Sequence, residues 1–188
     1  MVAALLRFLQ NTLFIFLILV PLRSWAAPQL GDPAPAIDLP QLDVKKSGAS
    51  LGPLLKLNPQ PGQVYVIDFF ATWCASCLKA TTALADVLPA LGDRVSLIVV
   101  DVGQPPQVVA DHFAAHPLPP KTQVVIDPDG EAARRFGQDR FPTTFLVDDH
   151  GVIAHINRGY GPGYKARIDR WLRSMLGLPP AAPKLLPQ

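Results

Sequence analysis

Two cysteines, Cys74 and Cys77, are the residues whose type and spacing are best suited to carry chemistry. They are the only cysteines among the 188 residues, and they stand three positions apart, where a strongly apolar run gives way to a helical pattern. That placement predicts Cys74 at the N-terminus of a helix, where unpaired backbone N–H groups and the helix dipole favour a thiolate. Cys77 follows one turn later, close enough to form a disulfide with Cys74. Such a pair exchanges electrons with other dithiols.

Other uses of two cysteines at this spacing fit the sequence less well. A disulfide that closes so short a loop removes little chain entropy, so a purely stabilising bridge gains little. A zinc site needs further ligands, and the chain has no other cysteines and only four scattered histidines (His112, His116, His150 and His155). Haem attachment needs a histidine directly after the second cysteine, where this chain has Leu78. The pattern therefore favours a redox-active pair with no metal and no other cofactor.

Asp68 is the third residue with chemical potential, because it lies six residues before Cys74 inside an apolar run. In an extended strand it shares a face with Val66 and Phe70, and its neighbours on the other face are also apolar, which predicts burial. A buried carboxylate is costly to ionise, so we expect a raised pKa. The alternative is an aspartate at a strand end that points to solvent.

The elements that must position these residues follow from the apolar periodicity, which alternates between strand and helix patterns. Continuous apolar runs predict strands at residues 64–70, 95–102 and 123–126. Helical spacing predicts helices at residues 78–91, 107–115, 131–136 and 163–176. Two further strands, residues 143–147 and 152–157, flank a turn sequence and predict a hairpin. Short strands near residues 37–39 and 50–51 form an N-terminal extension, so the order predicts an α/β fold with a central mixed sheet and helices on both faces.

Length and composition fit one domain with terminal extensions. The chain is 49% hydrophobic and has a formal net charge of +2. Without residues 1–26, which contain Arg7 and Arg23, basic and acidic residues are equal in number. Such a balance gives no indication of nucleic acid as a partner, and it fits a monomer.

Residues 1–26 are typical of an export signal. A weakly positive start precedes an apolar segment, and small residues at positions 24 and 26 suit cleavage before Ala27. The alternative is an uncleaved anchor, because residues 3–22 are long enough to cross a bilayer. Both alternatives place the cysteines outside the cytoplasm. The main domain is expected at residues 27–177, followed by a proline-rich tail at residues 178–188 that we expect to be poorly ordered.

Three motifs resemble the thioredoxin superfamily. The segment from Phe69 to Cys77, FFATWCASC, resembles its active-site segment, and the segment from Phe141 to Ile153 resembles the downstream part of one branch. That branch comprises the exported thiol-disulfide oxidoreductases of TlpA, ResA and CcmG (DsbE) type. Residues 31–35, GDPAP, are similar to the usual opening of the same branch, so the resemblance covers roughly residues 31–176. It implies a thioredoxin-like fold.

The resemblance also assigns roles at the centre of the site. Cys74 is the expected nucleophile, exposed at the helix start with a lowered pKa, and Cys77 is the expected resolving thiol, partly covered by the helix. Asp68 occupies the place of a thioredoxin aspartate that helps to deprotonate the resolving thiol, where many TlpA-type proteins have asparagine. The residues between the cysteines lack the proline common in the family, and Ser76 is placed to donate a hydrogen bond to the Cys74 sulfur.

Four more residues are expected around the cysteines. Pro142 matches the cis-proline that faces the cysteine pair in thioredoxin-like folds. Phe141 and Thr143 would flank a substrate cleft, where backbone groups pair with an extended substrate strand. Trp73 would belong to the contact surface beside the nucleophile. The alternatives are that Phe141 is an ordinary core residue and that Trp73 is a packing aromatic at a strand end.

Three functions remain open from the sequence. The leading one is a periplasmic or membrane-tethered reductant of protein disulfides, supplied with electrons by a membrane donor of DsbD or CcdA type. By resemblance, its substrates would be the haem-attachment cysteines of apocytochrome c or the copper-site cysteines of oxidase assembly factors. The second is a thiol oxidant or disulfide isomerase, which would use the same residues at a higher potential. The third is a copper-binding chaperone using Cys74, Cys77 and a distant histidine, although copper chaperones on this fold usually space their cysteines one residue wider.

Overall fold

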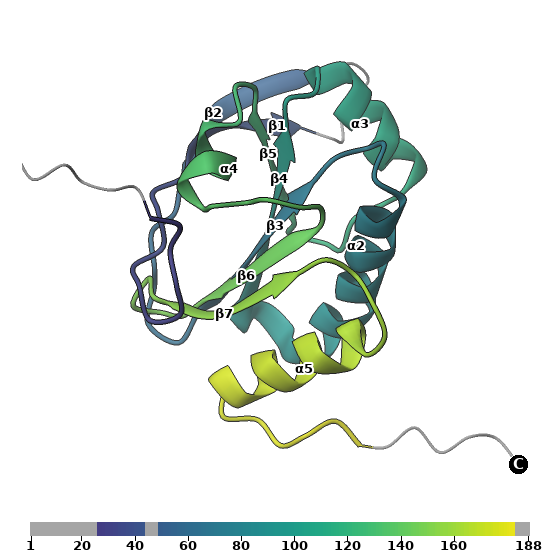
Figure 1. The fold of residues 1–188 in the computed structure, drawn as a ribbon. Helices are drawn as coiled ribbons and strands as arrows, with labels where there is room; N and C mark the ends of the chain where they lie inside the picture. The colour runs from purple at the N-terminus through teal and green to yellow at the C-terminus, as the bar shows by residue number, and fades with distance from the viewer. Residues whose placement is uncertain (1–25, 44–48, 183–188) are drawn as a thin grey trace, which may run out of the picture.

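The computed structural model describes residues 26–43 and 49–182, which form one twisted mixed sheet with helices on both faces (Figure 1). The seven strands in this part of the chain lie in the order β2-β1-β5-β4-β3-β6-β7. Their bounds are Asp38–Asp43 (β1), Ser50–Lys56 (β2), Val64–Phe70 (β3), Val95–Val102 (β4), Gln123–Asp127 (β5), Thr143–Val147 (β6) and Ile153–Arg158 (β7). The predicted α/β class and central mixed sheet are confirmed.

Strand β3 is an interior strand of the sheet and is buried over its whole length. It pairs in parallel with β4 and antiparallel with β6, so both of its edges are hydrogen-bonded. A strand covered on both faces needs apolar side chains in both directions, which explains the continuous apolar run in its sequence. Because β3 and β4 are parallel, their carboxyl ends lie side by side, and the chain that follows β3 begins at that end of the strands.

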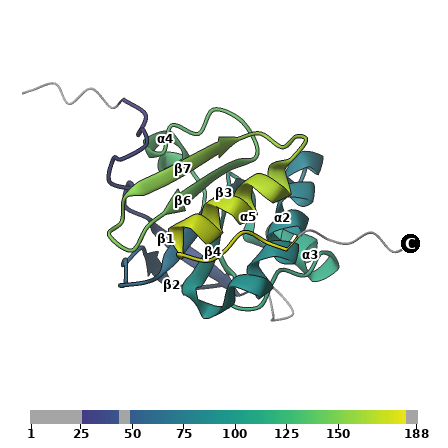
Figure 2. The ribbon, with the colours of Figure 1, turned by 90° about the horizontal axis from the view of Figure 1, so that it is seen from below.

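The helices divide between the two faces of the sheet. The α-helices are Ala75–Val87 (α2), Pro106–Ala115 (α3), Glu131–Arg135 (α4) and Tyr164–Met175 (α5). Residues of α2, α3 and α5 belong to one core cluster, which also contains both cysteines. Residues of α4 belong to the cluster on the opposite face. Figure 2 shows α5 lying across the sheet on the side of α2 and α3.

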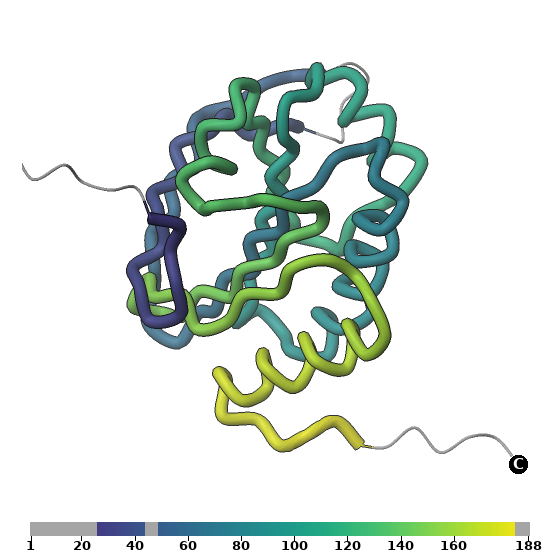
Figure 3. Tube along the Cα trace, viewed as in Figure 1, coloured from purple at the N-terminus to yellow at the C-terminus, as the bar shows by residue number. Residues whose placement is uncertain are grey.

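The segment that precedes β1 is attached to the β6–β7 hairpin. Figure 3 traces the first described residues beside the turn between these strands. The backbone N–H of Gly31 donates to the carbonyl of Ile153, and the N–H of Ala34 donates to the carbonyl of Gly151. The opening segment is therefore part of the domain rather than a free linker.

The predicted elements differ from the structure mainly at their ends. The helix predicted at residues 78–91 starts earlier, at Ala75, because Cys74 is its N-cap. It ends as an α-helix at Val87 and continues as a 3-10 helix, η1 (Leu88–Arg94), because Pro89 has no N–H to donate to the preceding turn. The strands predicted near residues 37–39 and 50–51 are longer than expected, because β1 and β2 pair with each other along their length.

Two predictions lie outside the described residues. The export segment falls there except for Ala26, and so does the last part of the expected tail, residues 183–188. Among the described residues, none of the helices combines the length and the apolar character needed to cross a bilayer.

Candidate active site

A disulfide joins Cys74 and Cys77 at the N-terminus of α2. Cys74 is the N-cap, and its carbonyl accepts hydrogen bonds from the N–H groups of Cys77 and Leu78, at 2.9 and 3.2 Å. The N–H of Cys74 itself donates to the carbonyl of Ala71 at 3.0 Å. The turn after β3 thus fixes the first cysteine at the positive end of the helix dipole, as predicted from the sequence.

Two donors point at the Cys74 sulfur. The backbone N–H of Cys77 donates to Sγ of Cys74 at 3.1 Å, and the hydroxyl of Ser76 lies 3.3 Å from the same sulfur. Because a disulfide sulfur carries no proton, the hydroxyl is the donor, which matches the contact expected of Ser76. After reduction, both donors would stabilise a thiolate at Cys74.

The expectation of an exposed Cys74 is wrong for this disulfide form. Only 6% of Cys74 is accessible, because its side chain turns inward to bond with Cys77. Cys77 is completely inaccessible. Solvent accessibility still distinguishes the two cysteines, since an incoming group can reach Cys74 but not Cys77.

Asp68 is fully buried, as predicted, on the sheet face that also carries the cysteines. Its strand neighbours Val66 and Phe70 belong to the same core cluster as Cys77, so the carboxyl points into the layer between the sheet and the helices. The hydroxyl of Thr144, directly opposite on β6, donates to Oδ1 of Asp68 at 2.8 Å. Among the described residues, Oδ2 has no hydrogen-bond partner.

Burial raises the pKa of Asp68 to about 7, and the hydrogen bond from Thr144 opposes this only in part. Thr144 also contacts the hydroxyl of Tyr164 at 2.9 Å. The pKa of Tyr164 is raised by its burial and by the negative charge of Asp68, so this phenol stays protonated. Two uncharged hydroxyl groups, those of Thr144 and Tyr164, thus form a hydrogen-bonded chain that ends at the Asp68 carboxyl, which can gain or lose a proton near neutrality. The sequence analysis did not identify either residue.

Asp101 is a second buried carboxyl on the same sheet face, and the sequence analysis did not identify it. It lies near the end of β4, paired in register with Phe70, and it is completely inaccessible. Burial raises its pKa to about 7, and the nearby backbone N–H of Gln104 lowers it in part. However, neither carboxylate oxygen of Asp101 has a partner close enough for a hydrogen bond among the described residues. The signal that drew attention to Asp68, an aspartate within an apolar strand, applies equally to Asp101.

Two aromatic side chains flank the N-terminus of α2. Trp73 is 70% exposed, and its ring meets the ring of Phe141 edge to face, with centroids 5.4 Å apart. Phe141 is half-buried and packs against both core clusters. The peptide bond between Phe141 and Pro142 is cis. The structure therefore brings Trp73, Phe141 and Pro142 together beside the cysteines.

Thr143 does not lie on this surface, contrary to the expectation that it flanks a cleft. It is completely inaccessible, and its backbone is the first position of β6, between β3 and β7. Its hydroxyl donates to the carbonyl of Arg140 at 2.6 Å. Thr143 therefore stabilises the loop that precedes β6 through this hydrogen bond and does not contribute to the exposed surface.

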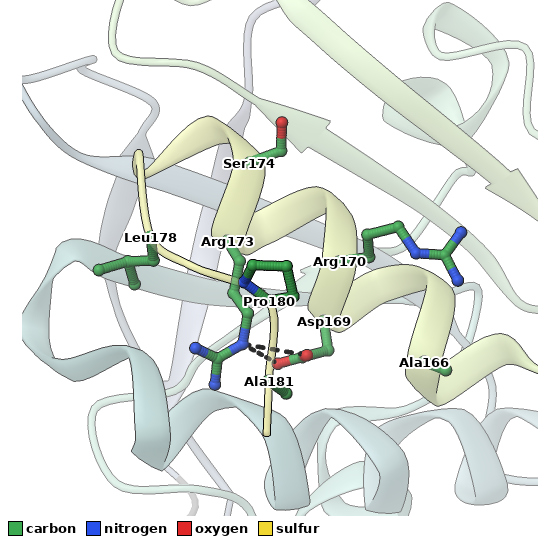
Figure 4. Close-up of a pocket in the computed structure, with 8 residues that line it drawn as sticks. All are labelled: Ala166, Asp169, Arg170, Arg173, Ser174, Leu178, Pro180 and Ala181. Atoms are coloured by element: carbon green, nitrogen blue, oxygen red, sulfur yellow. Dashed lines mark hydrogen bonds and ion pairs between the residues drawn. The ribbon is translucent and has the colours of Figure 1, made fainter. Parts of the chain in front are cut away.

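A pocket of about 460 Å³ on another side of the molecule lies between α5 and the chain that follows it (Figure 4). Asp169 and Arg173 form an ion pair in it, with an N–O distance of 2.9 Å. No cysteine lines this pocket.

One group of three possible metal ligands occurs among the described residues, at Asp148, Asp149 and His150 in the β6–β7 turn. Oδ1 of Asp148 accepts the N–H groups of His150 and Val152, and the ring of His150 contacts Asp149 at 2.7 Å. These contacts build the turn. Neither cysteine belongs to this group.

Comparisons with known proteins agree with this geometry. Residues 29–170 match the Redoxin family. The chain is 25% identical over 148 residues to the thiol-disulfide oxidoreductase ResA of Bacillus thuringiensis subsp. konkukian, covering 78% of this chain and 79% of that protein. It is 30% identical over 145 residues to the thiol:disulfide interchange protein DsbE of Xylella fastidiosa, covering 73% and 68%. A crystal structure of a thiol:disulfide interchange protein of the thioredoxin family from Chlorobium tepidum superposes with a TM-score of 0.61 at 22% identity, covering 80% of this chain and all of that one.

Proposed function

The chain belongs to the Redoxin family, and on that premise we propose that it is an exported thiol-disulfide oxidoreductase that reduces specific protein disulfides. Its relatives include thiol-disulfide oxidoreductases of ResA and DsbE type. One observation carries the proposal for this chain. The disulfide between Cys74 and Cys77 lies at a helix N-terminus, with one sulfur reachable and the other enclosed. The disulfide itself is the redox group, and no further cofactor is needed.

The reaction transfers two electrons in two exchange steps. In the reduced protein, the thiolate of Cys74 attacks a sulfur of the substrate disulfide, which forms a mixed disulfide and releases one substrate thiolate. The thiol of Cys77 then loses its proton and attacks the Cys74 sulfur. This step forms the Cys74–Cys77 disulfide and releases the second substrate thiolate. The substrate gains two electrons and the protein loses two.

Asp68 is the proposed acceptor for the proton of Cys77. It is buried on the same sheet face, and its pKa of about 7 lets it accept and release a proton near neutrality. Thr144 holds one carboxylate oxygen, which leaves the other free to bind the proton. The role is general-base catalysis of the resolving step.

Regeneration requires an electron source outside the molecule. If residues 1–26 direct export, cytoplasmic reductants are out of reach, so a membrane donor of DsbD or CcdA type would return two electrons to the disulfide. We propose apocytochrome c or copper-site cysteines as substrates, as the resemblance of the segments around Cys74 and Pro142 implies. We expect a monomer in the periplasm, tethered to the inner membrane if residues 3–22 stay attached.

A thiol oxidant is the second candidate, and the donors at the Cys74 sulfur favour it. The N–H of Cys77 and the hydroxyl of Ser76 would stabilise a thiolate. Stabilising the thiolate stabilises the reduced protein, which raises the reduction potential.

The reduction potential decides between these candidates. Residues 27–188 would be equilibrated with glutathione or dithiothreitol mixtures, and the fraction of disulfide measured by thiol labelling. We expect a value near or below about −270 mV, as in thioredoxin. A value near about −120 mV, as in DsbA, would mean that electrons flow in the opposite direction.

Trp73→Ala is expected to lower kcat/KM for a protein disulfide roughly tenfold, because exposed aromatic side chains often anchor a partner. Stability should change by less than about 0.5 kcal/mol, since the ring is 70% exposed. A small disulfide should react at the unchanged rate, because it does not reach the ring. Leu54→Ala, at an exposed leucine on the edge strand β2, is the matched control. An unchanged kcat/KM for protein substrates would remove Trp73 from the contact surface.

A further inference from the structure

We propose that Gln104 is a positioning residue of the redox site, whose side-chain amide holds the turn that carries Trp73 and Cys74. The inference rests on the proposed function for its catalytic meaning. It concerns a residue in the loop between β4 and α3, more than twenty positions from the cysteines in the sequence.

Two hydrogen bonds join Gln104 to a single residue of the turn. Oε1 of Gln104 accepts the backbone N–H of Thr72 at 2.6 Å, and Nε2 donates to the hydroxyl of Thr72 at 2.7 Å. Both residues are half-buried. One amide group thus fixes the main chain and the side chain of Thr72 together, which defines the orientation of that residue.

The loop that carries Gln104 is itself anchored to the sheet. Gly103, with a φ of +76° that suits glycine, donates its N–H to the carbonyl of Asp127 at 2.9 Å. The carboxylate of Asp127 is buried and accepts the N–H groups of Ala132 and Ala133 at the start of α4. The amide of Gln104 therefore projects from a fixed frame, so it can impose a position on the turn.

The position of Thr72 matters because Cys74 follows two residues later. Between Thr72 and α2, the turn contains only Trp73 and the N-cap, and the N–H of Cys74 bonds back to Ala71. Without Gln104, the N–H of Thr72 loses its partner, and the turn can move relative to the helix. Movement would misalign Cys74 with the N–H groups that stabilise its thiolate, and it would displace Trp73.

The test compares Gln104→Ala with Gln107→Ala in the full chain. Gln107 lies in the first turn of α3, is exposed, and bonds to Ala49 and Asp111 instead of the turn. Alkylation of Cys74 by iodoacetamide in the reduced proteins would be followed against pH, with thermal unfolding in parallel. For Gln104→Ala we expect the midpoint of the profile to rise by about half a pH unit, so that the rate at pH 6 falls about threefold. Gln107→Ala should follow the wild type.

Each outcome decides the inference. A folded Gln104→Ala protein with an unchanged profile would overturn it, and so would an equal shift in both variants. If Gln104→Ala does not fold, Thr72→Val, which removes one of the two hydrogen bonds, is judged by the same criteria. Alkylation requires no turnover, so the result is separable from the proposed function, which fails if the wild-type protein reduces no protein disulfide.

Discussion

Replacing Cys74 by serine is expected to lower disulfide reduction by at least about a thousandfold, to the level of the reaction without protein. A serine hydroxyl does not ionise near neutral pH, so the nucleophile disappears. Cys77 cannot take over, because it is completely inaccessible. Turnover would be measured with a protein disulfide and a chemical reductant in excess.

Cys77→Ser is the matched variant, and it should behave differently. Cys74 can still attack, but nothing resolves the product, so a mixed disulfide accumulates to one equivalent per protein. Non-reducing electrophoresis and mass spectrometry would detect it. Accumulation through Cys77 in Cys74→Ser, with none in Cys77→Ser, would reverse the assignment of nucleophile and resolving thiol.

Asp68→Asn is expected to stabilise the protein at pH 8 by about 2–4 kcal/mol and to slow the resolving step about tenfold or more. The carboxyl has a pKa of about 7 in the folded chain against an ordinary value of 3.8. Between these values the folded state keeps a proton that the unfolded state loses. The stability contributed by the protonated group is therefore complete below about pH 4 and falls as the pH rises to about 7.

The magnitude follows from the size of the pKa change. Each pKa unit corresponds to about 1.36 kcal/mol, so ionising Asp68 in the folded protein costs roughly 4 kcal/mol at pH 8. Asparagine avoids that cost, although its amide must also be buried next to Thr144. Urea unfolding at pH 4.5 and pH 8 should show a loss of stability in the wild type that is smaller in the variant, which keeps only the part due to Asp101.

Asp101→Asn is the control for the kinetic part of this prediction. It also replaces a buried carboxyl on the same face with a pKa of about 7, but Asp101 lies on β4 and pairs with Phe70 rather than with the Thr144 position. Resolution of the mixed disulfide, followed by stopped flow, should slow in Asp68→Asn and stay unchanged in Asp101→Asn. Equal rates in all three proteins would show that Asp68 takes no part in proton transfer.

Local sequence determined the elements of this protein and the place of its cysteines. The apolar run of β3, followed by a helical pattern, was sufficient to predict Cys74 at a helix N-terminus, because strand and helix periodicities are local properties. The burial of Asp68 could be predicted for the same reason, since alternation within one strand reveals both of its faces.

Contacts between distant segments were decided by the tertiary structure alone. Thr144 meets Asp68 because β6 pairs with β3, and Gln104 meets Thr72 because the ends of β3 and β4 lie side by side. The burial of Thr143 depends likewise on the two strands that flank it. These partners lie more than thirty residues apart or belong to separate strands, and no local periodicity records which strands become neighbours. The packing of the whole sheet and its helices selects which strands pair. The place of the cysteines could therefore be predicted from the sequence, whereas the residues that contact Asp68 and the turn before Cys74 could be identified only in the folded structure.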